Sequence, residues 1–188
     1  MDKVMNEIAV RRFTIEEYNR MAETGVLSRD EHVELLQGLV CEMSPEGKRH
    51  VAAIELAHDF FTDRLRGKHR VRAQHPLTLA EDTEAEPDIA IVETADPRAY
   101  LDSHPTAALL VIEISETSLE KDLTLKAELY ARAGISEYWV LNLTNDTLEV
   151  FRDPSESHYL KRQTLKRGEK ISPVRLPDIS VGVVDLLP

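Results

Sequence analysis

Apolar residues recur along this chain at two spacings, one typical of helices and one typical of buried strands. Near the start, Thr14 and Glu17 form a T-x-x-E capping box, which predicts a helix that begins at Ile15 and stops at Gly25. Apolar residues at helical spacing predict two further helices, and Gly134 provides the stop signal for the second of them. The predicted helices therefore cover residues 15–24, 50–66 and 120–133.

Short apolar runs between these helices predict the strands. The runs Asp88–Val92 and Leu109–Ile114 are typical of strands that are buried on both faces. A single strand is predicted over Val71–Leu79, with a kink or a sheet edge at Pro76. The other predicted strands are a pair within 33–43 that bends at Gly38, a hairpin of 138–143 and 148–152, and two or three strands within 158–188.

This order of helices and strands predicts a mixed α/β (α+β) layer fold. A chain of 188 residues fits one domain of ordinary size and is long enough to bury a sizeable core. We therefore expect one domain over residues 1–188. The helix and strands of residues 12–45 are expected to pack on its core as an extension.

The charge balance narrows the possible partners. The chain has 23 Lys and Arg against 34 Asp and Glu, which gives a formal net charge of −11. This excess of acid argues against a protein that coats nucleic acid non-specifically, although it leaves room for a local basic patch. The single cysteine, Cys41, excludes an intramolecular disulfide and a cysteine-based zinc site within one chain.

Neither a signal peptide nor a membrane span is expected. The N-terminus has no apolar core of signal-peptide length, and the longest aliphatic stretch, Ala107–Ile112, has only six residues. We therefore expect a cytoplasmic protein with no membrane partner.

Two carboxylates in the middle of the chain are the strongest candidates for chemistry. Asp88 opens one apolar strand and Glu113 lies near the end of another, where a charge needs a partner. If the two strands pair, these hard oxygen ligands would suit Mg²⁺ or Mn²⁺, completed by a backbone carbonyl and water. The alternative is an ion pair between Glu113 and a neighbouring Lys or Arg that has no further role.

Lys126 is a further candidate for a catalytic role, and four other residues are candidates for accessory roles. Asp122 and Lys126 are four residues apart and share a helix face, so Lys126 can point back toward Glu113 or can form an ordinary surface pair. Tyr130, one turn further, can line the site or pack in the core. His50 opens a helix after a loop, and the alternative to a role in the site is an ordinary surface or capping histidine. Glu34 interrupts an apolar run, but a strand whose side chains alternate between the inside and the outside explains this charge equally well.

An ordered set of motifs along the chain resembles the Uma-type family of restriction endonucleases, a branch of the PD-(D/E)XK nuclease superfamily. The resemblance covers roughly residues 12–187. The matching segments are FTIEEYNRM, VELLQGLVCEMSPEGKRH, EPDIAIV, LLVIEISETSLEKDLTLKAELYARAGISEYWVLN and LPDISVGVVDL. It implies a restriction-endonuclease-like core, which is a mixed central sheet flanked by helices.

The resemblance also implies a metal-dependent endonuclease that hydrolyses DNA phosphodiester bonds with Mg²⁺ or Mn²⁺. Asp88 and Glu113 would be the metal ligands, with the carbonyl of Ile114 as a further ligand. The superfamily usually places a lysine two residues after the second acid, where this chain has Ser115. The Uma-type branch moves that lysine to the following helix, which makes Lys126 the third catalytic residue. DNA is expected to bind weakly, and a homodimer is expected because two sites cut a duplex most simply.

Two other functions are open at this point. The first is a nuclease-fold protein without catalysis that binds a partner or assembles with itself. The acidic charge and the missing strand lysine favour this function, and Tyr138 and Trp139 would then anchor an interface, although a core position for Trp139 is the alternative. The second is a glycosidase with two carboxylates, which the low aromatic content of 5% disfavours.

Overall fold

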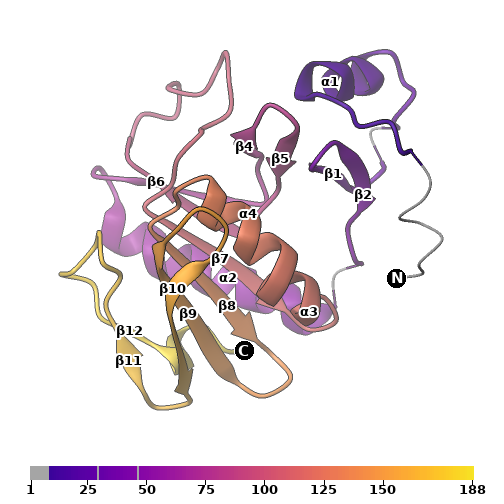
Figure 1. Ribbon diagram of the computed structural model, residues 1–188. Helices are drawn as coiled ribbons and strands as arrows, with labels where there is room; N and C mark the ends of the chain where they lie inside the picture. The colour runs from indigo at the N-terminus through magenta and orange to yellow at the C-terminus, as the bar shows by residue number, and fades with distance from the viewer. Residues whose placement is uncertain (1–8, 29, 46) are drawn as a thin grey trace.

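The computed structural model of this protein describes residues 9–28, 30–45 and 47–188. A six-stranded sheet forms its centre, with the strands in the spatial order β10-β9-β8-β7-β6-β3 (Figure 1). Strands β7 and β8 are parallel, whereas the other neighbouring pairs are antiparallel. The strands of this sheet are β3 (Arg70–Ala73), β6 (Ile89–Val92), β7 (Leu110–Ser115), β8 (Glu137–Asn142), β9 (Thr147–Pro154) and β10 (Tyr159–Lys166).

Helices pack on both faces of this central sheet. On one face lies the long helix α2 (Lys48–Leu65), whose Phe61 belongs to the same core cluster as Ile112 of β7. Helix α4 (Ala127–Arg132) belongs to the cluster that contains Val111, the neighbouring residue of the same strand. Because successive side chains of a strand point to opposite faces, β7 contributes to both cores. No helix in the described part of the chain has the length and apolar character needed to cross a membrane.

A second, four-stranded sheet lies beside the first one, in the order β2-β1-β5-β4 (Figure 1). Its strands pair antiparallel, and β1 and β2 are joined by a two-residue turn at Gln37 and Gly38, where the sequence predicts a bend. Since β1 pairs with β5, the strands near the N-terminus share a sheet with residues from the middle of the chain. The strands are β1 (Val33–Leu36), β2 (Leu39–Glu42), β4 (Leu77–Ala80) and β5 (Thr83–Ala85).

The first helix, α1 (Ile15–Glu23), confirms the prediction from the capping box. The hydroxyl of Thr14 accepts a hydrogen bond from the backbone N–H of Glu17, and the carboxylate of Glu17 accepts one from the backbone N–H of Thr14. The helix ends two residues before Gly25, whose φ of 75° is in the left-handed region that favours glycine.

The prediction of one kinked strand over Val71–Leu79 is wrong. The structure has two strands there, β3 in the central sheet and β4 in the smaller one. Between them, Gln74 has a φ of 52° and Pro76 has no N–H to donate to a ladder, so neither sheet can continue through this segment. The sequence predicts that the tail adds two or three strands at the sheet edge, and three strands are present, but only β10 of these lies at the edge of the central sheet. The strands β11 (Lys170–Ile171) and β12 (Val181–Gly182) pair with each other in a separate sheet, before a 3₁₀ turn, η2 (Val183–Asp185).

The helix predicted over 120–133 is present but is interrupted. It consists of α3 (Leu119–Lys121), a π-helical turn η1 (Asp122–Lys126) and α4. A π-turn widens the helix locally and is frequent at functional sites. Such a turn is a single wider turn within a helix of otherwise ordinary composition, so apolar spacing over 120–133 predicts a helix but not the π-turn.

Tyr138 and Trp139 do not form an exposed pair, so the prediction that they anchor an interface is wrong. Both side chains are fully buried. They lie on β8, which has β7 on one side and β9 on the other, and their side chains enter the two opposite core clusters. Because both faces of the sheet are covered at this strand, neither aromatic ring reaches the surface.

Candidate active site

A small cavity of about 50 Å³ lies where β6 and β7 meet the start of α2 and the π-turn η1. It has room for one or two water molecules or a cation. Its polar lining includes four carboxylates, two ammonium groups and one imidazole. The lining residues are Met43, Ser44, His50, Glu86, Asp88, Glu113, Ile114, Ser118, Lys121, Asp122 and Lys126.

Strand pairing brings Asp88 and Glu113 together. Strands β6 and β7 are antiparallel with Ile89 opposite Ile112, so Asp88 and Glu113 come next to each other at the end of this register. The backbone N–H of Asp88 donates to Glu113 Oε2 at 3.3 Å, and the backbone N–H of Ile114 donates to Asp88 Oδ2 at 2.7 Å. Both carboxylates are therefore held by the sheet itself.

The π-turn places Lys126 inside this site. Its side chain is only 4% exposed, and its Nζ lies 2.9 Å from Glu113 Oε1 and 3.2 Å from Glu34 Oε2. Although burial opposes the charge of a lysine, the carboxylates of Glu113 and Glu34 raise the pKa of Lys126 above its usual value. Lys126 therefore remains an ammonium group, and the surface-pair interpretation does not apply to it.

Tyr130 completes the contacts of Glu113. Its hydroxyl donates to Glu113 Oε1 at 2.7 Å, and its side chain is fully buried. Burial, followed by the charge of Glu113, raises the pKa of Tyr130 well above 10. Burial also raises the pKa of Glu113 to about 8, against the opposing effect of Lys126. Glu113 and Tyr130 therefore keep their protons to a higher pH than they would in water, because they are buried beside other acidic groups.

His50 and Asp122 lie at the periphery of the site and contact its neighbouring residues. His50 Nε2, in the first turn of α2, lies 3.3 Å from Asp88 Oδ2. Asp122 Oδ2 accepts hydrogen bonds from Ser115 Oγ at 2.6 Å and from Ser118 Oγ at 2.5 Å. Asp122 therefore holds the loop between β7 and α3, and Ser115, which stands where the superfamily usually has its lysine, is its partner.

The structure adds two residues that the sequence analysis missed. Lys121 Nζ lies 3.2 Å from Glu34 Oε1, and the backbone N–H of Glu86 donates to Glu34 Oε2 at 3.3 Å. Burial raises the pKa of Glu86. In the sequence, Glu86 is close to Asp88 and Lys121 is next to Asp122, which could have pointed to them. Glu86 and Lys121 lie in stretches rich in charged residues, however, so their positions were not conspicuous. Glu34 itself links β1 of the smaller sheet to the helix that carries both lysines.

The donors of this site fit a magnesium or manganese ion. Within the described residues, no three His, Cys, Asp or Glu side chains are grouped so that they could hold a metal ion. Mg²⁺, however, is commonly bound through one or two carboxylates and several waters. Asp88 and Glu113 supply two adjacent carboxylates, and the excess of acids over lysines along the cavity favours a divalent cation.

The raised pKa of Glu113 predicts a pH-dependent stability. Folded Glu113 keeps its proton up to about pH 8, whereas the unfolded side chain loses it near pH 4.5. The folded state therefore binds more protons between these values, so the contribution of Glu113 to the free energy of unfolding falls as pH rises from about 5 to about 8. Urea unfolding at pH 5, 6.5 and 8 should show a shallower fall for Glu113→Gln than for the wild type. Equal slopes would contradict this prediction.

Comparisons with known proteins agree with this architecture. A crystal structure described as that of a putative nuclease from Anabaena variabilis is similar, with a TM-score of 0.71 and 15% sequence identity over 93% of this chain and 97% of that chain. At this identity the likeness shows the fold, and it confirms the predicted nuclease-type α+β fold. The type IIG restriction endonuclease BpuSI is less similar, with a TM-score of 0.44 and 17% identity over 69% of this chain and 16% of that chain. No curated protein matches the chain.

The sequence itself gives the family. The profile of the Uma2 family, described as "Putative restriction endonuclease", matches residues 15–184. This match includes both strands that carry Asp88 and Glu113 and the helical segment that carries Lys126. Since it spans nearly the whole chain, the protein belongs to the Uma2 family, as the resemblance of its motifs predicts.

Proposed function

We propose that this protein is a metal-dependent endonuclease that hydrolyses phosphodiester bonds of DNA. The observation that carries the proposal is the position of Lys126 Nζ, 2.9 Å from Glu113 on one of two paired strands, with Asp88 on the other. Two acidic oxygen ligands and an ammonium group at one cavity are the groups that phosphodiester hydrolysis requires. Membership of the Uma2 family supports the same reaction class.

Each residue has a separate role in this proposal. Asp88, Glu113 and the carbonyl of Ile114 would hold Mg²⁺ or Mn²⁺, which when bound polarises the phosphate and lowers the pKa of a bound water. Lys126 stabilises the charge that develops on the phosphate or orients the attacking water. Tyr130 keeps Glu113 in its orientation through its 2.7 Å hydrogen bond.

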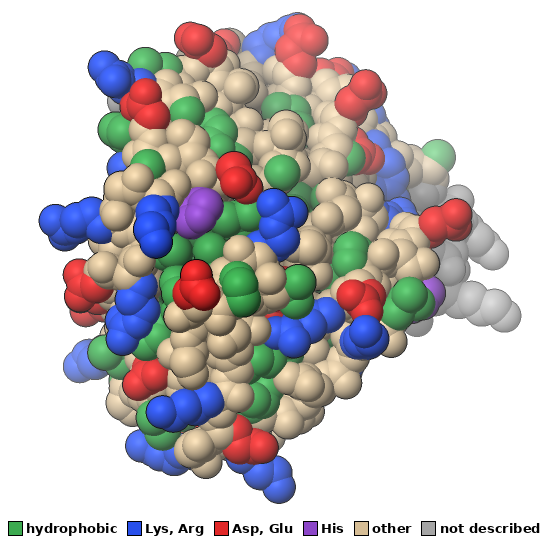
Figure 2. All heavy atoms as spheres, turned by 90° about the vertical axis from the view of Figure 1, so that its left-hand side faces the viewer, with side chains coloured by type: hydrophobic (Ala, Val, Ile, Leu, Met, Phe, Trp, Pro, Cys, Tyr) green, Lys and Arg blue, Asp and Glu red, His purple; other side chains and the backbone are tan. Residues whose placement is uncertain are grey.

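DNA binding is expected to be weak and sensitive to salt. Basic side chains on β10 are the proposed contacts, but Arg162 lies 3.0 Å from Glu149 and Lys161 lies 2.7 Å from Asp153. These ion pairs reduce the charge that is available for phosphates. Figure 2 shows basic and acidic side chains interspersed over one face of the molecule. A homodimer, with two sites related by a two-fold axis, would add contacts and would allow both strands of a duplex to be cut.

A cleavage assay tests the proposed function. Purified protein would be incubated with supercoiled plasmid, linear duplex, single-stranded DNA and RNA, each with Mg²⁺, Mn²⁺ or EDTA. We expect cleavage of DNA with either metal and none with EDTA. The exposed substitution Asp63→Asn on α2 is the control and should cleave at the wild-type rate. If no substrate is cut with either metal, the proposed function is wrong.

A second candidate function is a nuclease-fold protein without catalysis. It is favoured by the contacts of Glu113 Oε1, which already accepts hydrogen bonds from both Lys126 and Tyr130. A carboxylate satisfied in this way is also typical of a structural ion pair. Calorimetric titration with Mn²⁺ separates the candidates: binding that Asp88→Asn removes supports the nuclease, whereas no binding supports the second candidate.

A further inference from the structure

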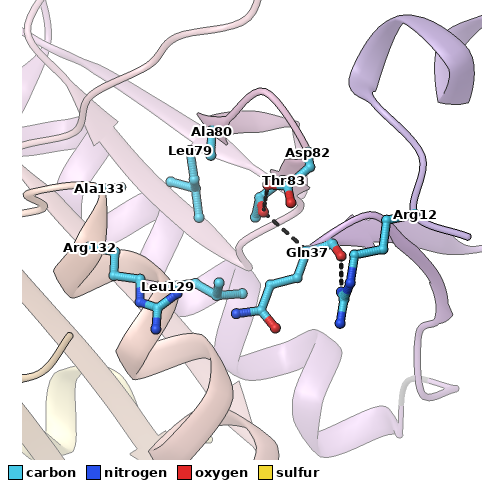
Figure 3. A pocket seen from close by; sticks show the side chains of 9 residues that line it. All are labelled: Arg12, Gln37, Leu79, Ala80, Asp82, Thr83, Leu129, Arg132 and Ala133. Atoms are coloured by element: carbon cyan, nitrogen blue, oxygen red, sulfur yellow. Dashed lines mark hydrogen bonds between the residues drawn. The ribbon is translucent and has the colours of Figure 1, made fainter. Parts of the chain in front are cut away.

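A second cavity, of about 360 Å³, lies at the β1–β2 turn and the end of α4. None of its lining residues lines the smaller cavity at Asp88 and Glu113. Four separate segments form its walls, which are the N-terminal segment before α1, the β1–β2 turn, the β4–β5 hairpin and the end of α4 (Figure 3). The lining residues are Arg12, Gln37, Leu79, Ala80, Asp82, Thr83, Leu129, Arg132 and Ala133.

Two arginines and an amide lie around this cavity. Figure 3 shows Arg132 on one side and Gln37 with Arg12 on the other, and Leu129 lies between them. One N–H of Arg132 is used by Glu128, at 2.5 Å, and one of Arg12 is used by the carbonyl of Gln37. A guanidinium group has five N–H donors, so each arginine keeps donors for a ligand.

The charged and apolar side chains that line this cavity indicate which class of ligand would fit it. The charged lining consists of two arginines and one acid, Asp82, in a chain whose net charge is −11. Leu79, Leu129 and Ala133 add an apolar surface between the charged groups. The volume of this cavity lies in the range of small-molecule sites, and its wall combines polar groups with a smaller apolar part. Arginine pairs favourably with carboxylate and phosphate groups.

The backbone at Gln37 is a second, independent observation. Gln37 and Gly38 form a two-residue hairpin turn in which both residues have positive φ, 51° and 75°. Such a turn favours Asn or Asp before Gly, and the longer glutamine gains nothing from it. Two other segments hold the turn in place: the backbone N–H of Phe13 donates to the carbonyl of Gly38 at 2.8 Å, and the backbone N–H of Gly38 donates to the carbonyl of Asp82 in the β4–β5 hairpin at 2.7 Å. Non-glycine residues in this region are often kept for function.

We infer that this cavity binds a small organic anion, a carboxylate or phosphate ester with an apolar or aromatic body. Arg132 and Arg12 would bind the anionic group, and the amide of Gln37 would donate a further hydrogen bond. Leu129 and Leu79 would contact the apolar body. The inference does not depend on the proposed nuclease activity, because it uses none of the residues that carry that proposal.

A ligand here would join two parts of the molecule. The turn that carries Gln37 belongs to the four-stranded sheet, whereas Arg132 belongs to the helix on the central sheet. A ligand that binds only the folded state raises the apparent stability by RT ln(1 + L/Kd), where L is the free ligand concentration. Thermal unfolding in the presence of a ligand therefore reports on this site without any nuclease assay.

Binding is tested with defined probes on the full chain, without DNA or metal. The probes are a deoxynucleoside 5′-monophosphate, phthalate and inorganic phosphate, with the uncharged deoxynucleoside as the matched neutral compound. We expect calorimetric binding and a raised Tm with the nucleotide or phthalate, and at least about tenfold weaker binding of the deoxynucleoside. Nucleotide binding alone identifies a phosphate ester, and phthalate binding alone identifies a carboxylate. Equal binding of the neutral compound, or no binding of any organic anion, would overturn the inference.

Two substitutions locate the binding. Arg132→Gln should weaken binding by about tenfold or more. Gln37→Asn suits the turn better but shortens the amide, so it should keep or raise the Tm of the free protein and still weaken binding. Arg66→Gln, an exposed position on another face of the fold, is the control and should bind as the wild type does. Unchanged affinity in both Arg132→Gln and Gln37→Asn would show that the ligand binds elsewhere.

Discussion

Replacing Lys126 with methionine should lower the free energy of unfolding by about 3–5 kcal/mol at pH 8. The ammonium group lies between Glu34 and Glu113, at 3.2 and 2.9 Å, and all three side chains are almost completely buried. Methionine fills a similar volume but provides no charge, so Glu34 and Glu113 would lose their shared ammonium partner in a site that water hardly reaches. Removing one partner of a buried ion pair is costly for this reason.

The pH dependence identifies the cause of this loss. Lys126 lowers the pKa of Glu113, so Glu113 should keep its proton to a higher pH in Lys126→Met, and the difference between this variant and the wild type should shrink as pH falls below about 8. Lys121→Met is the matched control, because Lys121 forms an ion pair with the same Glu34, through Oε1, but is 31% exposed; we expect a loss of about 1 kcal/mol or less. Urea unfolding at pH 5 and 8 measures both. A loss for Lys126→Met that is independent of pH would indicate a packing defect instead.

Replacing Asp88 with asparagine should reduce metal-dependent DNA cleavage by about a hundredfold or more while the fold is retained. The asparagine oxygen can still accept the hydrogen bond that Asp88 Oδ2 receives from the backbone N–H of Ile114 at 2.7 Å. What is lost is the negative charge that a divalent cation requires. This substitution separates catalysis from stability better than a change at Glu113, which is bonded to Lys126 and Tyr130.

The effect of Asp88→Asn is measured by two quantities, the initial rate of DNA cleavage and the affinity for Mn²⁺. Both should decrease in Asp88→Asn, and the thermal unfolding curve should stay close to that of the wild type. Asp63→Asn carries the same chemical change at an exposed position of α2 and should leave rate and affinity unchanged. If Asp88→Asn cleaves at the wild-type rate, then the site is assigned to the wrong residues, even though the activity remains.

The sequence by itself determined most of the helices and strands and drew attention to the two acids in the central strands. Apolar runs around Asp88 and Glu113 predict buried strands because burial on both faces excludes polar side chains from those positions. A charge inside such a run is therefore conspicuous in the sequence. The spacing of Asp122 and Lys126 likewise predicts a shared helix face, and the structure has both residues at the cavity.

Only the tertiary structure decided which side chains meet. Glu34 reaches Lys126 because β1 pairs with β5, a contact between segments far apart in the sequence that periodicity cannot encode. The π-turn did not show in the sequence pattern, and for the strand predicted over Val71–Leu79 the sequence signalled only a kink or sheet edge at Pro76. That the two halves of this segment belong to different sheets follows from the strands with which each half pairs. Local patterns determine which residues are buried, whereas the pairing of strands and the packing of helices determine which buried charges face each other.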